Sequence, residues 1–431
     1  MSDCNGINVI GCGKLGLPLI ALLASHYKNI LGIDINSELI LSLKNKRVPW
    51  FEPGLELLIS ANFENIRFSS EITDAYINGT SLIIVPTPSE SDGKFSNYYI
   101  NKVLENLAKH LVSKTFVQHS IVIVSTVMPG SFENEFEPLL KKILGEKYNF
   151  LNLVYSPEFI ALGNVIDDMK FPEIQIVGVK SFSSANSYLT LVSKVIQSKP
   201  EVHILNWLES EVAKIALNSF ITMKISYANQ IGEITEGIQN FDASKVLQAI
   251  GGDSRIGHKY LYPAGAYGGP CFPRDNRALS AFASAYGKIA NLAVATDVIN
   301  NRQSRRVLNK VIEISKLSDR ILLIGASYKP NTEVTEESPS LDFYHIAQKA
   351  GFDIRICDEN IKNLSGYDFI SLDELIKVQE FNFQILINFS SSSSYLKLTN
   401  YLNRNVKIID LWGNWEAYEA QFINYFKFSK N

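Results

Sequence analysis

A glycine-rich turn near the start of the chain restricts the possible folds more than any other feature. The apolar residues 7–10 predict a strand, residues 11–16 read Gly-Cys-Gly-Lys-Leu-Gly, and residues 15–25 have a helical pattern. A second predicted strand, residues 30–33, leads into Asp34. In this order, glycines let the backbone approach a pyrophosphate, the helix N-terminus faces its charge, and the acid can accept from a ribose hydroxyl. We therefore expect a dinucleotide-binding unit.

The residues after this acid favour NAD over NADP as the dinucleotide. Ile35 and Asn36 follow Asp34, so the sequence places no arginine there for a 2′-phosphate. Strands predicted at residues 81–85 and 120–124 end at the edge where sheets of this kind bind ligands. Taken alone, residues 85–88 and 125–127 at these strand ends would be ordinary turns. With the glycine loop, the expected cofactor-binding residues are Gly11, Gly13, Lys14, Leu15, Gly16, Asp34, Pro86, Thr87 and Thr126.

The rest of the chain predicts a second sheet, because 431 residues are too many for one hydrophobic core. Residues 207–239 predict a long helix, and apolar runs separated by helical stretches resume at residue 320. A run of five serines within residues 389–395 predicts a loop. The expected fold is α/β, with two doubly wound Rossmann-like domains joined by a central helical region with a long helix. The expected divisions are residues 1–200, 201–305 and 306–431.

Charge and cysteine spacing argue against several classes of protein. A formal net charge of -3 provides no basic field for nucleic acid or an anionic membrane. Cys4, Cys12, Cys271 and Cys357 lie far apart, so neither a disulfide framework nor a metal site is expected. No stretch of 18 uncharged apolar residues occurs. We expect a cytoplasmic protein that binds neither nucleic acid nor membranes.

The segment around Cys271 carries the strongest signal for covalent chemistry. Residues 268–275 read Gly-Gly-Pro-Cys-Phe-Pro-Arg-Asp. Pro273 suits the first turn of a helix, so the thiol would stand just before a positive helix end that stabilises a thiolate. A cysteine is more often a small buried side chain. The neighbouring glycines and Asp275 nevertheless favour a catalytic nucleophile here.

Three further polar residues have roles that their spacing alone leaves open. Lys214 and Asn218 stand four residues apart on the predicted long helix and therefore share one face. That face can be a solvated stripe or a partly buried polar pair. Glu158 follows another apolar run, where a carboxylate can act as a base or cap a turn.

Together these motifs resemble the UDP-glucose/GDP-mannose dehydrogenase family of nucleotide-sugar 6-dehydrogenases over nearly the whole chain. The resemblance implies an NAD-binding domain at residues 1–200, a catalytic and dimer-forming region at 201–305, and a nucleotide-sugar domain at 306–431. It also implies a homodimer in which Arg255 reaches the substrate of a neighbouring subunit. The matching segments are the glycine loop with Asp34, residues 52–55, 86–88, 125–130, 156–159, 255–257 and 268–275, and Lys214 with Asn218.

The resemblance also implies a reaction, the oxidation of a sugar C6 alcohol to a carboxylate with two NAD+. Cys271 would attack the aldehyde to give a thiohemiacetal, which a second hydride transfer converts to a thioester. Lys214 would hold developing negative charge on the substrate oxygen, with help from Asn218. Asp275 would sit near the attacking water, and Glu158 would support thioester hydrolysis. The catalytic residues implied are Cys271, Lys214, Asn218, Asp275, Glu158 and Thr126. The substrate-binding residues implied are Glu158, Phe159, Lys214, Asn218, Arg255, Tyr260, Leu261, Tyr262, Gly268 and Lys329.

Two positions depart from the family. Glu336 stands where the family usually has an arginine that contacts the cofactor, and Trp412 stands where it often has an arginine for the ligand phosphates. Losing such a cation would cost about 1.5 to 3 kcal/mol of binding if no other residue compensates.

The leading hypothesis is a UDP-glucose 6-dehydrogenase that supplies polysaccharide synthesis. Residues 272–275 resemble the UDP-glucose type more than the histidine-containing form of the N-acetylated-sugar enzymes, although GDP-mannose enzymes share nearly the same motif. A GDP-mannose or UDP-N-acetylhexosamine 6-dehydrogenase is an alternative. A catalytically weakened nucleotide-sugar-binding protein, and a single-step NAD-dependent hydroxy-acid dehydrogenase that needs no cysteine, are two others.

Overall fold

The computed structural model describes residues 6–378 and 381–430, so Cys4 lies outside the described part of the chain. Two compact units divide the chain, Met1–Ile215 and Ala216–Asn431. The boundary falls inside the long helix α8 (Trp207–Ile234). No helix in the described part of the chain is long and apolar enough to cross a membrane.

The first unit is built on an eight-stranded sheet in the order β3-β2-β1-β4-β5-β6-β7-β8. All neighbouring strands run parallel except β6 and β7. The strand order reverses between β1 and β4, which makes their carboxyl ends the expected ligand edge. The strands are β1 Gly6–Ile10, β2 Ile30–Ile33, β3 Ile66–Ser69, β4 Gly79–Ile83, β5 His119–Ile123, β6 Leu151–Tyr155, β7 Ile174–Val179 and β8 Glu201–Leu205.

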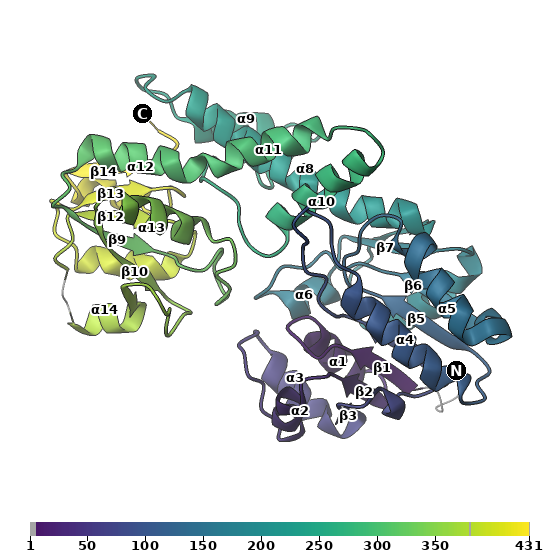
Figure 1. Ribbon diagram of the computed structural model, residues 1–431. Helices are drawn as coiled ribbons and strands as arrows, with labels where there is room; N and C mark the ends of the chain where they lie inside the picture. The colour runs from purple at the N-terminus through teal and green to yellow at the C-terminus, as the bar shows by residue number, and fades with distance from the viewer. Residues whose placement is uncertain (1–5, 379–380, 431) are drawn as a thin grey trace. The chain divides into compact units, whose positions relative to one another are not determined.

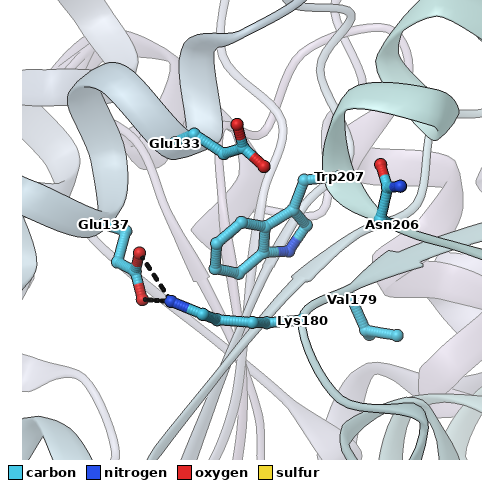
Figure 2. Close-up of a pocket in the computed structure, with 6 residues that line it drawn as sticks. All are labelled: Glu133, Glu137, Val179, Lys180, Asn206 and Trp207. Carbon is cyan, nitrogen blue, oxygen red and sulfur yellow. Dashed lines mark hydrogen bonds and ion pairs between the residues drawn. The ribbon is translucent and has the colours of Figure 1, made fainter.

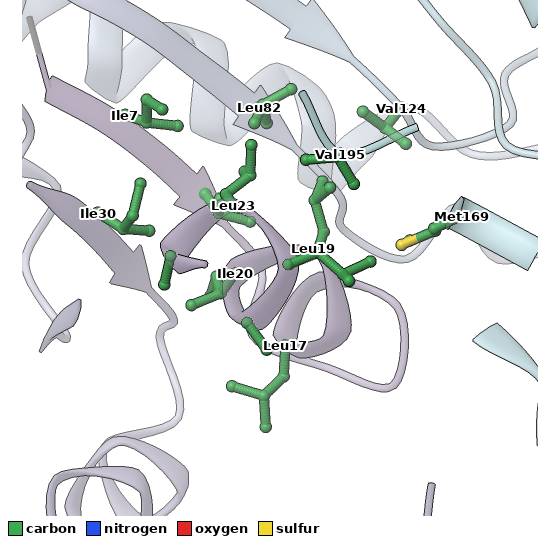
Figure 3. Close-up of a cluster of buried hydrophobic side chains, with 14 of the residues drawn as sticks. Ile7, Leu17, Leu19, Ile20, Leu23, Ile30, Leu82, Val124, Met169 and Val195 are labelled. Atoms are coloured by element: carbon green, nitrogen blue, oxygen red, sulfur yellow. The ribbon is translucent and has the colours of Figure 1, made fainter. Parts of the chain in front are cut away.

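Helices cover both faces of this sheet. Successive strand residues point to opposite faces, so Val9 packs into one apolar cluster and Ile10 into the other. All nine residues of α1 are buried. Figure 3 shows Leu19, Ile20 and Leu23 of this helix among strand side chains that include Ile7, Ile30 and Leu82. The helices are α1 Gly16–Ala24, α2 Ser37–Lys44, α3 Leu55–Asn62, α4 Tyr98–Val112, α5 Glu137–Leu144, α6 Val165–Lys170 and α7 Ala185–Val192.

The second unit contains a helical region followed by a six-stranded parallel sheet in the order β11-β10-β9-β12-β13-β14 (Figure 1). This order reverses between β9 and β12. The strands are β9 Arg320–Ile324, β10 Asp353–Asp358, β11 Phe369–Ser371, β12 Ile385–Asn388, β13 Lys407–Asp410 and β14 Asn424–Lys427. The helices after α8 are α9 Ala243–Gly251, α10 Phe272–Ala285, α11 Asn291–Asn301, α12 Gln303–Ile314, α13 Pro339–Lys349 and α14 Leu372–Val378.

The fold class predicted from the sequence is confirmed: two doubly wound sheets, the first of them parallel except for the β6–β7 pair, accompany a helical region with a long helix. The long helix ends earlier than predicted, at Ile234, because the chain turns through Gly237, which has a positive φ of 81°. The serine run is not wholly irregular, since a 3₁₀ helix begins at Ser393 and Ser392 caps it.

We expect the α1 packing to dominate the stability of the first unit. Leu23 is fully buried, so Leu23→Ala should lower the free energy of unfolding by about 2 to 5 kcal/mol. Leu57 on α3 is 78% exposed and serves as the matched control. Leu57→Ala should change the value by less than about 0.5 kcal/mol. Urea unfolding followed by circular dichroism measures both, and equal losses would contradict this account of the core.

Candidate active site

The glycine loop after β1 combines tight packing with one open position. Gly11 has a φ of 102°, and a Cβ there would lie 1.9 Å from the Ile84 carbonyl oxygen. A Cβ on Gly16 would lie 1.8 Å from the Gly11 carbonyl oxygen. Apart from its two chain neighbours, no described residue has a heavy atom within 4 Å of the Cβ position of Gly13. The outer glycines therefore shape the turn, and Gly13 leaves open space that a pyrophosphate can approach.

Asp34 is linked to this loop by its carboxylate. The Cys12 amide donates to one oxygen at 2.8 Å, and the Asn36 amide donates to the other at 2.9 Å. Both acceptor oxygens keep lone pairs for a ribose hydroxyl. The Cys12 thiol is buried, and burial together with the Asp34 charge raises its pKa, so it behaves as a small apolar side chain.

The carboxyl ends of β4 and β5 are joined beside this loop. The Val85 amide donates to Ser125 Oγ at 2.9 Å, and that hydroxyl donates to the Val85 carbonyl at 2.7 Å. Thr87 Oγ1 donates to the Thr126 carbonyl at 2.8 Å. The two threonines expected at the cofactor site thus lie together at the strand-order reversal.

Glu158, Phe159 and Lys214 form a second group in the first unit. Lys214 Nζ donates to the Glu158 carbonyl at 2.8 Å and lies 4.6 Å from the centre of the Phe159 ring. Burial raises the pKa of the Glu158 carboxyl to about 7, although the Lys214 charge acts to lower it. A carboxyl with this pKa can accept and release a proton near neutral pH.

The α8 face that carries Lys214 and Asn218 is buried, which decides between the two sequence interpretations. Both side chains are 7% exposed. Asn218 Nδ2 donates to Asp275 Oδ2 at 2.6 Å within the second unit. Glu211 on the same helix, which sequence analysis missed, accepts from the amides of Gly130 at 2.6 Å and Phe132 at 3.0 Å.

Cys271 occupies the N-cap position of α10, as the sequence predicts, with Pro273 in the first turn. Among the described residues its sulfur forms no disulfide, and its side chain is exposed. Asp275, one turn later, is 1% exposed, and its amide donates to the Cys271 carbonyl at 2.8 Å. The helix start therefore presents an accessible sulfur and a buried carboxylate that Asn218 holds.

The glycines before Cys271 pack against the segment that follows β9. A Cβ on Gly268 would lie 2.1 Å from the Glu337 carbonyl oxygen, and one on Gly269 would lie 2.4 Å from the Tyr328 ring. Burial raises the pKa of the Tyr328 phenol, and the charge of Cys271 adds to the effect. Lys329 follows directly, so the Lys329 segment and the cysteine loop are neighbours.

The other predicted substrate residues have different surroundings. Tyr260 has a φ of 62° and is 48% exposed, with its ring edge-on to Phe272 at 6.1 Å. Leu261 is buried in a cluster with α8 and α9 residues, so its side chain serves packing. Tyr262 stacks on Trp412. Arg255 is exposed, and its guanidinium pairs with Asp253 at 2.7 Å rather than with the other candidates.

A cavity of about 290 Å³ in the first unit contains none of the predicted site residues. Figure 2 shows Lys180 and Glu137 paired beside the Trp207 ring, with the ammonium 2.9 Å from one carboxylate oxygen. Lys141 and Tyr148 contact the same carboxylate. Since Glu137 already has these partners, we assign this cluster to stability rather than to ligand binding.

The chain is similar to known protein families, sequences and structures. The family model "UDP-glucose/GDP-mannose dehydrogenase family, NAD binding domain" matches residues 5–196, and the model of the central domain of that family matches residues 208–302. UDP-glucose 6-dehydrogenase TuaD of Bacillus subtilis is 29% identical over 359 residues, which cover 82% of this chain and 75% of that protein. GDP-mannose 6-dehydrogenase of Pseudomonas savastanoi pv. phaseolicola is 28% identical over 367 residues, covering 83% and 81%. The structure of a UDP-glucose dehydrogenase from Pyrobaculum islandicum has a TM-score of 0.88 at 22% identity, covering 99% of this chain and 98% of that one, so the folds agree.

The glycine loop gives a test that separates binding from folding. Gly13→Ala adds a methyl group in open space, so the protein should keep its melting temperature while its Kd for NAD rises about tenfold or more. Gly16→Ala is the contrasting variant, because its methyl group would overlap the Gly11 carbonyl, and it should lower the melting temperature. Calorimetric titration with NAD and thermal unfolding measure the two effects. Unchanged NAD affinity in Gly13→Ala would contradict the assignment.

Proposed function

This chain belongs to the UDP-glucose/GDP-mannose dehydrogenase family, and from this premise we propose that it oxidises UDP-glucose to UDP-glucuronate in two steps on Cys271. Its cofactor is NAD, since residues 5–196 match the NAD binding domain of the family. The observation that carries the two-step proposal is the exposed Cys271 thiol at the start of α10, one turn from the buried Asp275.

The cofactor site is formed by the chain's own loop and strand ends. Gly13 leaves the open approach for the pyrophosphate, and Asp34 keeps lone pairs for the ribose hydroxyls. Thr87 and Thr126, joined at the ends of β4 and β5, would line the nicotinamide side of the reversal point. When bound, NAD accepts the hydrides that leave C6.

The proposed chemistry balances as one alcohol, one water and two NAD+ giving one carboxylate, two NADH and three protons. The first hydride leaves C6 as the alcohol loses its proton, which gives the aldehyde. The Cys271 thiolate then attacks the aldehyde carbon and forms a C–S bond. Loss of the second hydride from this thiohemiacetal gives a thioester, and water breaks the C–S bond to release the carboxylate and the thiolate.

Charged and polar groups around the substrate would assist these steps. Lys214, buried and held by the Glu158 carbonyl, would stabilise negative charge on the reacting oxygen. Asn218, fixed by Asp275 at 2.6 Å, would support the same oxygen. Glu158, with a pKa near 7, would take the proton of the water that hydrolyses the thioester.

The choice of UDP-glucose rests on residues 272–275, because the relatives include enzymes named for UDP-glucose and for GDP-mannose. The remaining substrate contacts that we propose are Phe159, Tyr260, Tyr262, Gly268, Lys329 and the backbone of Leu261. We further propose a homodimer in which Arg255 completes the neighbouring subunit's site. Residues 1–200 would bind NAD, residues 201–305 would supply catalysis and the dimer contact, and residues 306–431 would bind the nucleotide sugar. A cytoplasmic location, where the separated cysteines stay reduced, and a role in polysaccharide synthesis complete the proposal.

Product stoichiometry and Cys271→Ser test the two-step reaction. The wild-type protein should yield two NADH per uronate with UDP-glucose, and more slowly or not at all with GDP-mannose and UDP-N-acetylmannosamine. Cys271→Ser should stop carboxylate formation, because a serine hydroxyl is scarcely ionised at neutral pH and is a weak nucleophile, and an alkoxide is a far poorer leaving group than a thiolate. Coupled absorbance and uronate assays measure both. A ratio of one, or unchanged uronate output from Cys271→Ser, would refute the proposal, and ligand binding without turnover would favour a binding protein.

The pKa of Glu158 gives a pH test. Because burial raises this pKa to about 7, the ionised base form grows as the pH rises through 7, and kcat should rise with it. Glu158→Gln should remove this acid limb and slow turnover by about 10² to 10⁴ fold. Glu211→Gln is the matched control, since burial raises the Glu211 pKa to about 7 as well while its carboxylate accepts from the backbone amides of Gly130 and Phe132. If the rise of kcat through pH 7 disappeared in Glu211→Gln but persisted in Glu158→Gln, the role of Glu158 would be contradicted.

A further inference from the structure

Trp412 lies two residues after the end of β13, at the carboxyl edge of the second sheet, and a hydrogen bond holds its ring. Its indole Nε1 donates to the Phe389 carbonyl at 3.0 Å, and its amide donates to Asp410 Oδ1 at 3.2 Å. The ring is parallel to the Tyr262 ring within 2°, with 6.2 Å between their centres. Despite these contacts the residue is 39% exposed. Trp412 therefore presents aromatic surface whose orientation is already set.

The support beneath this ring is rigid. Asp410 is fully buried, and its carboxylate accepts from the Trp415 amide and from the Tyr425 hydroxyl, each at 2.8 Å. Gly413 packs closely against the other ring of the pair, since a Cβ there would lie 2.5 Å from the Tyr262 hydroxyl oxygen. An aromatic surface that is ordered before binding loses little conformational entropy when a ligand arrives.

The location favours a nucleotide over other planar ligands. Parallel sheets bind nucleotides beyond the carboxyl ends of strands near the order reversal, here between β9 and β12, and β13 is the next strand along. Asn388 at the end of β12 donates to Asp410 Oδ1 at 2.9 Å, so the two strand ends are joined. Tyr262 belongs to the substrate residues proposed above. An indole carries no charge for a phosphate, but it stacks on any base.

We propose that Trp412, backed by Tyr262, is a stacking platform for the nucleobase of the nucleotide sugar. This inference rests on the proposed function, in which the second unit binds the nucleotide part of the substrate. Base stacking replaces the phosphate contact that an arginine at this position would supply. The gain in affinity from one stacked base compensates for the lost ion pair, because stacking on an aromatic side chain contributes about 5 to 100 fold in affinity.

The test compares full-length variants in calorimetric titrations with UDP. Trp412→Ala should raise the Kd for UDP about 5 to 100 fold, whereas Trp412→Phe, which keeps a flat ring, should stay within about threefold of wild type. In steady-state assays with UDP-glucose, Trp412→Ala should raise KM while kcat stays near the wild-type value. Melting temperatures confirm that each variant is folded.

Tyr401 supplies a matched control within the same unit. It is also 39% exposed and stacks on Phe381, with 5.6 Å between ring centres and 15° between planes. It lies in the turn after the 3₁₀ helix Ser393–Asn400, not at the carboxyl end of a strand. Tyr401→Ala should leave the Kd for UDP unchanged.

The outcomes separate this inference from the proposed function. The platform would be overturned if wild type and Trp412→Ala bound UDP with equal affinity, whether or not Trp412→Arg bound UDP more tightly. The dehydrogenase proposal would then remain intact. Wild-type binding of GDP instead of UDP, lost in Trp412→Ala, would support the platform and correct the substrate. An equal loss in Tyr401→Ala would also overturn it, because the effect would then be unspecific.

Discussion

The position of the Cys271 thiol depends on two glycines that leave no room for side chains. Gly268 and Gly269 press against the backbone near Glu337 and against the Tyr328 ring, and the Gly269 amide donates to the Glu336 carbonyl at 3.1 Å. The loop therefore reaches α10 at one defined place, where Cys271 becomes the N-cap. Residue 336 contributes its backbone carbonyl to this contact, so the contact does not depend on which side chain stands there.

Each of the two sheets has an aspartate at the end of its second strand in chain order, and the two aspartates have different partners. Asp34 after β2 is half-buried and accepts from the Cys12 amide, with capacity left for a ligand. Asp358 at the end of β10 is fully buried and accepts from the Ala326 and Ser327 amides at 2.7 and 3.0 Å, as well as from amides of its own loop. Asp358 therefore fixes the loop after β9. We propose that ligand recognition in the second unit depends on other groups, among them the aromatic pair of Tyr262 and Trp412.

Much of the fold could be predicted because local sequence patterns, such as apolar runs and helix-start residues, indicate its strands and helices. The apolar runs of β1 and β2 and the proline at the start of α10 predict their elements within a residue or two. Strand β8 (Glu201–Leu205) escapes prediction because it has no fully buried residue, and Val202 is 44% exposed, so no apolar run marks it. Strand β14 (Asn424–Lys427) is half-buried for most of its length and escapes for the same reason.

The candidate site was predictable in its residue types but not in its contacts. Spacing places Lys214 and Asn218 on one helix face, yet only tertiary packing decides that the face is buried and that Asn218 binds Asp275. Glu211 could not be recognised, because its partners are backbone amides of a turn far away in the sequence. From the sequence, Trp412 is interpreted as the absence of an arginine that the family resemblance implies. Its stacking on Tyr262 is seen only in the folded structure.

Covalent capture of the substrate by Cys271 is the central claim, and mass spectrometry of acid-quenched reactions tests it most directly. During turnover with UDP-glucose and NAD, the peptide that contains Cys271 should carry the added mass of the nucleotide sugar, and the mass should disappear when the substrate is exhausted. Uronate formation with no mass ever added to that peptide, and undiminished after alkylation of the Cys271 thiol, would contradict the account.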